Sequence, residues 1–241
     1  MTEWRAARAL AAFEFKRDWL GMTLTAVFAL YVGMIMSTAI EATLGSESPS
    51  RYMSCMTDWL YTFALPAFGC AMNRTVLGFW REDIFTRRLS HWRTMPIPIG
   101  GMASARMLLA VVTISAAGTI FFASQYMLTH ELRETVGIGA WIAAAVTWLC
   151  YGLALNSFYL YLEMGFSGKV YVKTYLCVCL GLGLLAALVA WERISLFREL
   201  LDAAKAAPLL MPLAAVLIAA AVLAVMRRVL IKRMESRSFT F

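Results

Sequence analysis

The sequence has little charge, and histidine is scarce. Of its 241 residues only 15% are charged and 61% are hydrophobic, and there are two histidines. Soluble domains carry about 25% charged and about 45–50% apolar residues. The number of cysteines, five, is odd, and no pair of them has the spacing of zinc ligands. This composition excludes a soluble enzyme, a disordered tail and a disulfide scaffold, and it predicts a membrane protein.

What the chain has instead is a series of long uncharged runs. A hydrocarbon core of about 30 Å needs about 20 helical residues to cross it. The runs therefore predict an all-α polytopic membrane protein: a single transmembrane domain over residues 1–241, with six transmembrane helices and an N-terminal interfacial helix. The expected spans are residues 20–40, 56–79, 107–129, 137–162, 174–191 and 207–226. The second is the weakest, because Asp58 and Arg74 flank its uncharged part and Pro66 is expected to kink it.

The basic residues are distributed unequally between the predicted loops. Segments that six alternating spans would place in the cytoplasm hold 17 of the 22 Lys and Arg residues, and the outer segments hold 5. Because basic residues favour the cytoplasmic side of a membrane, both termini are expected there, including a tail over residues 227–241. The net charge of +7 then belongs to a membrane face, and nucleic acid is not an expected partner.

Two polar segments are expected to form amphipathic helices. Residues 1–19 predict an interfacial helix that lies at the lipid headgroups, with a solvated basic leader as the alternative and no cleavable signal peptide. Its apolar stripe consists of Trp4, Ala7, Ala11, Phe15 and Trp19. Residues 192–206 predict a second amphipathic helix, on the outer surface, with a stripe of Ile194, Phe197, Leu201 and Ala204.

The longest predicted cytoplasmic loop, residues 80–106, contains a short helix. Acidic residues precede basic ones in it, an order that suits the helix dipole, and Pro96 and Pro98 stop the helix. A short helix that presents apolar residues between charges is suited to docking in a groove on another protein. The apolar residues are Ile84, Phe85 and Leu89. An ordinary basic loop is the alternative.

This loop carries a resemblance to a known family. The residues from Asp83 to Leu89, then Met95-Pro96-Ile97 and Arg106, resemble the first intracellular loop of permeases of type-2 ABC exporters. The compact chain is also similar to small peptide-exporting members such as the phenol-soluble-modulin exporter group. The resemblance implies a permease of the bacterial plasma membrane whose coupling helix binds a separate ABC ATPase. The implied coupling residues are Glu82, Asp83, Ile84, Phe85, Arg87, Arg88 and Leu89.

The same resemblance implies a second permease, identical or a sister, that meets this one through the first and fifth spans. Small residues allow helices to approach closely in lipid, although small residues that merely face lipid are an equal alternative. The candidates for the seam and the path are Gly33, Ser37, Gly181, Gly183 and Ala187. Asn73 and Arg74 are expected at the cytoplasmic mouth of the path.

The second predicted cytoplasmic loop is rich in small residues. It contains Gly165, Ser167, Gly168 and Lys169. The glycines are expected to shape a tight turn. The segment is not a P-loop, because its first glycine is misplaced and Val170 has no hydroxyl for magnesium. ATP and magnesium are therefore expected on the partner ATPase, and the chain itself is expected to hold no metal, cofactor or catalytic residue.

The sequence thus favours the permease subunit of an ATP-driven exporter. An amphipathic or hydrophobic substrate fits a path with few buried charges, and a peptide is favoured over a lipid or a drug. Two other classes stay open at this point: a non-transport scaffold or sensor subunit, and an ion-coupled carrier, which would need more ionisable groups within its spans.

Overall fold

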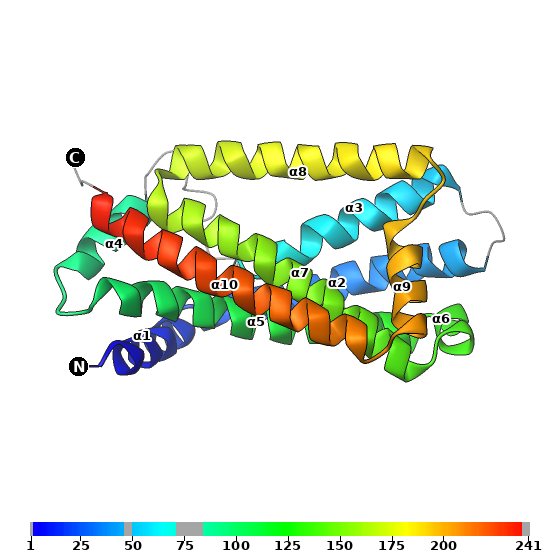
Figure 1. Cartoon of the computed structure of the whole chain (residues 1–241), viewed down its shortest axis with the longest axis horizontal. Helices are drawn as coiled ribbons and strands as arrows, with labels where there is room; N and C mark the ends of the chain where they lie inside the picture. The colour runs from blue at the N-terminus through cyan, green and yellow to red at the C-terminus, as the bar shows by residue number, and fades with distance from the viewer. Residues whose placement is uncertain (1, 46–49, 71–83, 238–241) are drawn as a thin grey trace.

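The computed structural model describes residues 2–45, 50–70 and 84–237, and the chain in these residues is helical with no strand. The helices described are α1 (Glu3–Arg17), α2 (Trp19–Leu44), α3 (Arg51–Ala67), α4 (Ile84–Arg93), α5 (Ile99–Leu128), α6 (His130–Thr135), α7 (Ile138–Gly165), α8 (Gly168–Trp191), α9 (Leu196–Ala206) and α10 (Leu210–Ser236). Most of them run along one common axis (Figure 1). Helices α1 and α4 and the C-terminal end of α10 share one end of the molecule, called the basic end below, and α6 and α9 lie at the other.

Five helices of the described part are long and apolar enough to cross a membrane, namely α2, α5, α7, α8 and α10. They correspond to the predicted first, third, fourth, fifth and sixth spans, so the all-helical fold class is confirmed for the described residues, and these helices have the length and composition expected of membrane spans. Several boundaries were wrong: α5 begins at Ile99 instead of 107, α8 begins at Gly168 instead of 174, and α10 continues to Ser236 instead of 226. The predictions ended each span at a charged residue. Arg and Lys instead lie within these helices, where some of them pair inside the bundle, as Arg106 does with Glu14 and Glu163 and Arg233 with the Gly165 carbonyl.

The predicted second span corresponds only in part to α3. This helix has 17 residues and is about 26 Å long, slightly less than the hydrocarbon core. Residues 71–79 of the predicted span lie outside the described residues, so six spans are not established. Pro66 stands in the last turn of α3 and marks its end instead of kinking its middle. The Pro66 carbonyl accepts a hydrogen bond from Asn156 Nδ2 at 2.9 Å, which ties the end of α3 to α7.

The N-terminal helix α1 packs on α5 through a face that differs from the predicted stripe. Of that stripe only Ala7 and Ala11 are buried, whereas the aromatic members Trp4, Phe15 and Trp19 are exposed. The buried face consists of Ala6, Ala7, Leu10, Ala11 and Glu14. Small side chains allow the two helices to approach closely. The alanines of α1 are therefore buried against α5, and its aromatic rings remain exposed.

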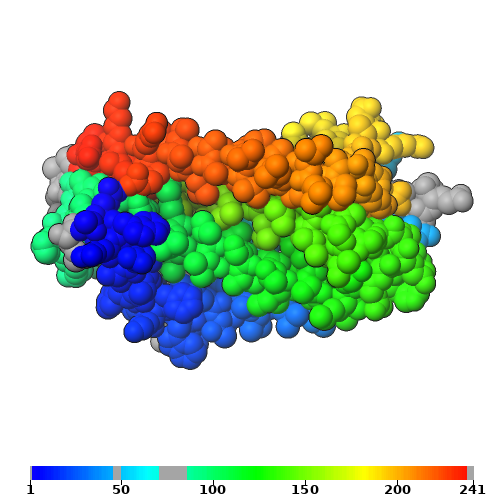
Figure 2. Space-filling view, turned by 60° about the horizontal axis from the view of Figure 1, so that its bottom comes forward, coloured from blue at the N-terminus to red at the C-terminus, as the bar shows by residue number. Residues whose placement is uncertain are grey.

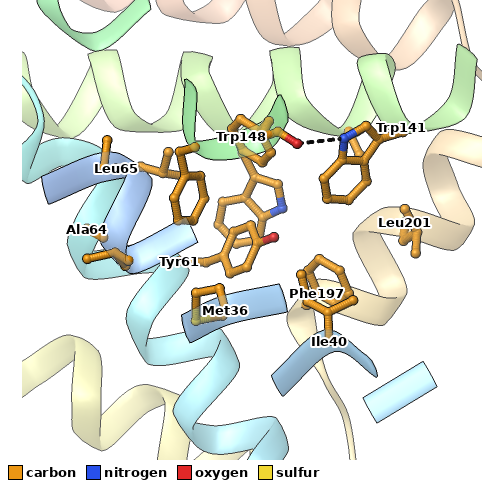
Figure 3. Close-up of a cluster of buried hydrophobic side chains, with 14 of the residues drawn as sticks. Met36, Ile40, Tyr61, Ala64, Leu65, Trp141, Trp148, Phe197 and Leu201 are labelled. Atoms are coloured by element: carbon orange, nitrogen blue, oxygen red, sulfur yellow. Dashed lines mark hydrogen bonds between the residues drawn. The ribbon is translucent and has the colours of Figure 1, made fainter. Parts of the chain in front are cut away.

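A cluster of aromatic rings forms the core towards the end that holds α9. Tyr61 of α3 stands at its centre, with its ring centroid 5.1 Å from those of Trp148 and Phe197 and 5.5 Å from that of Phe121 (Figure 3). These rings come from α3, α5, α7 and α9, so one residue joins four helices. The Tyr61 hydroxyl lies 2.5 Å from Gln125 Oε1, to which it donates its proton. Trp141 Nε1 donates to the Phe122 carbonyl at 3.3 Å, as the dashed line in Figure 3 shows.

The predicted outer amphipathic helix is present as α9. Phe197, Leu201 and Ala204 of the predicted stripe are buried, with at most 1% of each residue exposed, whereas Ile194, its fourth member, precedes α9 and is 45% exposed, so the stripe is confirmed for three of its four residues. The stripe packs into the aromatic core instead of lying on a lipid surface. Arg198, on another face of α9, donates to the carbonyl of Thr43 at the end of α2. The helix therefore closes this end of the bundle.

We expect Gly33→Leu to destabilise the protein. Gly33 of α2 lies against α5, where an added Cβ would overlap Ser124 Oγ and lie 3.1 Å from the Phe121 carbonyl oxygen. Overpacking of this kind costs about 1–3 kcal/mol, so the thermal midpoint in detergent should fall. The control is Gly181→Leu on α8, where no atom lies within 4 Å of an added Cβ. An equal fall in both variants would contradict the packing of α2 on α5.

Candidate functional site

The short helix α4 lies at the basic end, across the ends of the long helices (Figure 1). Leu89 and Trp92 are buried, and they join a hydrophobic cluster with residues of α1, α5, α7 and α10. Leu89 was expected to face a partner protein, and that expectation was wrong, because this side of α4 is used to hold the helix to its own chain. Arg87 and His91 are exposed on the other side. Helix α4 therefore has one face that packs on the bundle, with Leu89 and Trp92, and one exposed face, with Arg87 and His91, called the open face below.

Four charged residues meet beneath α4 and form what we call the charged hub: Glu14, Arg88, Arg106 and Glu163. Glu14 of α1 is fully buried, and its carboxylate pairs with Arg88 of α4 and with Arg106 of α5, the latter at 3.2 Å from Nη1. Arg106 Nη2 also lies 2.6 Å from Glu163 Oε1 of α7. Two carboxylates and two guanidinium groups thus link four helices that are distant in sequence.

The hub is stable because each of its buried charges is paired with an opposite charge. An uncompensated charge in a buried site costs several kcal/mol, whereas hydrogen-bonded pairs recover most of that cost. Burial, the largest cause, and the neighbouring Arg106 together lower the pKa of the Arg88 guanidinium to about 9, although Glu163 acts in the opposite direction. Arg88 remains a cation at neutral pH, since its pKa is still above 7. Arg17, on the exposed side of α1, adds a contact of 3.4 Å from its Nη2 to Glu14 Oε1.

The C-terminal end of α10 holds α4 from the other side. Arg93 at the end of α4 donates to the carbonyls of Met234 and Arg237, the latter at 3.4 Å. Arg237 in turn donates to Thr86 Oγ1 at 2.5 Å and to the Met164 carbonyl at 2.9 Å. Residues 227–236, predicted as a cytoplasmic tail, are therefore the last turns of α10. They clamp α4 against the end of α7.

The predicted second cytoplasmic loop is only a two-residue connection, which lies beside the contacts between α4 and the end of α10. Helix α7 ends at Gly165, and α8 begins at Gly168. An added Cβ on Gly165 would lie 3.0 Å from Arg233 Cγ of α10, and the Gly165 carbonyl accepts from Arg233 Nε at 3.3 Å. Gly165 is thus needed for a close approach of α10. Lys169, one turn further along, is exposed.

The seam candidates do not share one surface. Gly33 and Ser37 of α2 lie against α5: Gly33 meets Ser124, and the Ser37 carbonyl accepts from Thr129 Oγ1 at 3.4 Å. Gly183 of α8 faces Trp59 of α3, whose indole nitrogen would lie 3.2 Å from an added Cβ. These three residues therefore mediate packing within the protomer. Gly181 and Ala187 of α8 are exposed and remain available to a second subunit.

Some of the predicted site residues lie outside the described residues: Asn73, Arg74, Glu82 and Asp83. Ile84 and Phe85 form the first turn of α4. Of the predicted coupling residues, the structure thus brings Arg88 into the charged hub, buries Leu89 and leaves Arg87 at the surface.

Sequence reasoning missed the acidic half of the hub. Neither Glu14, within the predicted interfacial helix, nor Glu163, just after the predicted fourth span, was singled out in the sequence. The available signal was the position of Glu14 on the same helical face as Ala7 and Leu10, which makes it a charge on a buried stripe. Buried carboxylates need a cation, and Arg106 begins the first long apolar run after α4.

Asp58 was also misread, because it was placed near the membrane surface without a partner. It is fully buried, and it accepts hydrogen bonds from the backbone of Leu196 at 2.8 Å and of Phe197 at 2.9 Å. The Ser195 hydroxyl donates to the same carboxylate at 3.3 Å. Asp58 thus satisfies the free amides at the start of α9, the function that an N-cap residue usually performs from within its own helix.

We expect Glu14→Gln to destabilise the basic end. The amide cannot neutralise Arg88 and Arg106, and loss of one partner from a buried ion pair costs about 3–5 kcal/mol. The thermal midpoint in detergent should fall, and backbone amides of α4 should exchange hydrogen faster. Glu134→Gln removes an equal charge from an exposed contact with His130 at the opposite end, and it should change neither quantity. Unchanged exchange in α4 after Glu14→Gln would show that the hub does not hold this helix.

We expect Asp58→Ala to release α9 from the bundle. Two backbone amides and one hydroxyl lose their acceptor, and each buried donor left unpaired costs about 1–3 kcal/mol. Hydrogen exchange should rise in α9 and not in α4. The control is Asp202→Ala, which removes a carboxylate of α9 itself. Among the described contacts Asp202 pairs only with exposed Lys205, so hydrogen exchange in α9 should stay close to that of the unaltered protein. Similar exchange in both variants would rule out the capping role.

Comparisons with protein-family profiles, curated proteins and solved structures found no match to the chain. Its function must therefore be argued from the membrane-spanning helices, from α4 and from the contacts that connect them.

Proposed function

We propose that the chain is the permease subunit of an ATP-driven ABC exporter and that α4 is its coupling helix. The observation that carries the proposal is the attachment of α4. The charged hub joins it to α1, α5 and α7, and the Arg93 and Arg237 contacts join it to α10. A displacement of α4 by a partner would therefore act on four other helices at once. An ordinary surface loop would not need so many buried contacts.

The open face of α4 supports binding of a partner. Arg87 is exposed, whereas Leu89 and Trp92 hold the helix to the bundle, so a protein could bind the open face without breaking the core. The resemblance noted in the sequence identifies this partner as a separate ABC ATPase that binds ATP and magnesium. The chain then supplies the membrane path, and the ATPase supplies the energy.

The exposed apolar surface supports a place in the bilayer. Helix α8 exposes a row of leucines along its length, among them Leu180, Leu184 and Leu188, which suits contact with lipid or with a second permease. Trp4, Phe13, Phe15 and Trp19 are exposed beside the basic end, where aromatic rings suit the headgroup region. We place the basic end in the cytoplasm of a bacterial cell, with α1 as the interfacial helix.

The remaining span of this proposal is the predicted second one, over residues 56–79, of which α3 belongs to the described residues. A second permease, identical or a sister, completes the path. Five apolar helices with few charges between their ends favour an amphipathic or hydrophobic substrate, and an amphipathic peptide is our first choice. An ion-coupled carrier is less well supported, because the buried hub charges are paired with one another at the basic end.

The test is to reverse the charge on the open face of α4. Arg87→Glu and His91→Glu, at the two residues exposed on this face, should each reduce co-purification of the ATPase and peptide-stimulated ATP hydrolysis by about tenfold, which corresponds to about 1.4 kcal/mol of binding energy. The thermal midpoint of each purified variant should stay unchanged, because the buried contacts of Leu89, Trp92 and Arg88 are retained. Arg133→Glu, on α6 at the opposite end, is the matched control and should retain both ATPase and hydrolysis.

Two results would oppose the proposal. One is a chain purified from its own membranes with no ATPase attached, which would favour the scaffold or sensor class. The other is full peptide-stimulated hydrolysis in both α4 variants, which would remove the coupling role from this helix.

A further inference from the structure

A groove at the basic end lies apart from the charged hub. It has a volume of about 420 Å³ and runs between α1, α5 and α10. Figure 2 shows this face, with α1 beside the C-terminal half of α10. The residues that line it are Glu3, Trp4, Ser104, Met107, Leu108, Val111, Leu223, Ala224 and Arg227. Its polar residues lie at one end and its apolar residues at the other.

The groove follows one stripe on each of the two long helices. On α5 the lining residues recur every three or four positions from Ser104 to Val111, and on α10 they do so from Arg227 back to Leu223. Both stripes start at the basic end and run towards the middle of the bundle, becoming apolar within one turn. A molecule that fills the groove would therefore place a polar group at the mouth and a hydrocarbon chain along the wall.

The mouth holds a paired cation and anion, Arg227 and Glu3, and a second cation, Arg8, lies over the Trp4 ring with its Cζ 5.9 Å from the ring centroid. Arg227 Nε donates to Ser104 Oγ at 2.8 Å, and the Arg227 guanidinium also pairs with the Glu3 carboxylate. Both side chains remain partly exposed, 37% for Arg227 and 48% for Glu3. Gly100 at the start of α5 makes room for the carboxylate, because a Cβ there would overlap Glu3 Oε1. Trp4 forms the rim and exposes 56% of its surface.

We propose that this groove binds a zwitterionic phospholipid whose headgroup ends in a primary ammonium group. Its phosphate binds Arg227, its ammonium group binds Glu3 beside the Trp4 ring, and one acyl chain lies along Leu108 and Val111. Phosphate and guanidinium form charge-assisted hydrogen bonds, and an ammonium group donates to a carboxylate in the same way.

The charge pattern of the mouth selects among headgroups. An anionic lipid without an ammonium group would satisfy Arg227 but would place negative charge beside Glu3. A trimethylated ammonium group has no N–H to donate to the carboxylate. A headgroup with both a phosphate and a primary ammonium group satisfies both side chains. The inference does not rest on the proposed function, since any membrane protein with this groove would bind such a lipid.

The test uses brominated lipids, which quench tryptophan fluorescence on contact. The full-length protein is placed in bilayers of an unbrominated choline lipid that contain increasing fractions of a brominated ethanolamine, glycerol or choline phospholipid. The difference between the protein and its Trp4→Phe variant isolates the signal of Trp4. We expect the ethanolamine lipid to quench this signal at a mole fraction about tenfold lower than the other two, the ratio given by one additional charge-assisted hydrogen bond.

Variants identify the side chains responsible. Glu3→Gln and Arg227→Gln should abolish the preference for the ethanolamine lipid. Arg228→Gln, an exposed neighbour outside the groove, should keep it. Val111→Phe leaves the mouth unchanged and fills the apolar wall, so it should weaken quenching by all three lipids. This last variant tests the groove even where a change at the mouth disturbs α1.

Equal quenching by the three lipids in the unaltered protein would overturn the proposal, and it would mean that Trp4 contacts only bulk lipid. Stronger quenching by the glycerol lipid would also overturn it, because that result assigns the site to an anionic headgroup. Loss of the preference in Arg228→Gln as well would attribute the effect to net charge instead of the groove.

Discussion

The structure at the basic end depends on one constraint: Glu14 is fully buried and must be neutralised where it stands. Its carboxylate binds Arg88 and Arg106, and Arg106 extends the same pairing to Glu163. None of the four residues can leave without stranding a buried charge, so the positions of α1, α4, α5 and α7 become dependent on one another. The apolar contacts of Leu89 and Trp92 stabilise α4, but they do not select one orientation as the charged groups do.

The opposite end of the molecule is held together by a different kind of contact. There a single carboxylate, Asp58, satisfies the amides at the start of α9, and the buried face of α9 packs on the ring of Tyr61. Several of the contacts of Tyr61 are with aromatic rings, and its hydroxyl has its own acceptor in Gln125. Both ends resist displacement, but for different physical reasons: close packing of rings at this end, and the cost of separating buried charges at the basic end.

The apolar runs predicted the long helices, because one physical requirement, the thickness of the hydrocarbon core, acts on a continuous segment. The stripe of α9 was also predictable, since Phe197, Leu201 and Ala204 define one face of an isolated helix. The hub was not predictable, because its charged residues lie far apart in the sequence. Arg106 is 92 residues from Glu14 and 57 residues from Glu163. Charge at the end of an apolar run has the same appearance in sequence whether it faces water or a partner. Leu89 was misassigned for a related reason: a short amphipathic helix shows its apolar face but does not show which neighbour covers it.

The division of α4 into a bound face and an open face explains why its sequence has so many arginines. Arg88 and Arg93 point their donors into the bundle, where Glu14 and the end of α10 accept them, while Arg87 remains at the surface. A helix that only decorated a membrane surface would need none of the inward contacts. A helix that only filled the core would not expose Arg87. The proposed coupling role uses both sets of contacts: a force received on the open face would pass through the hub to the long helices, because the buried charges cannot separate without a large cost in free energy.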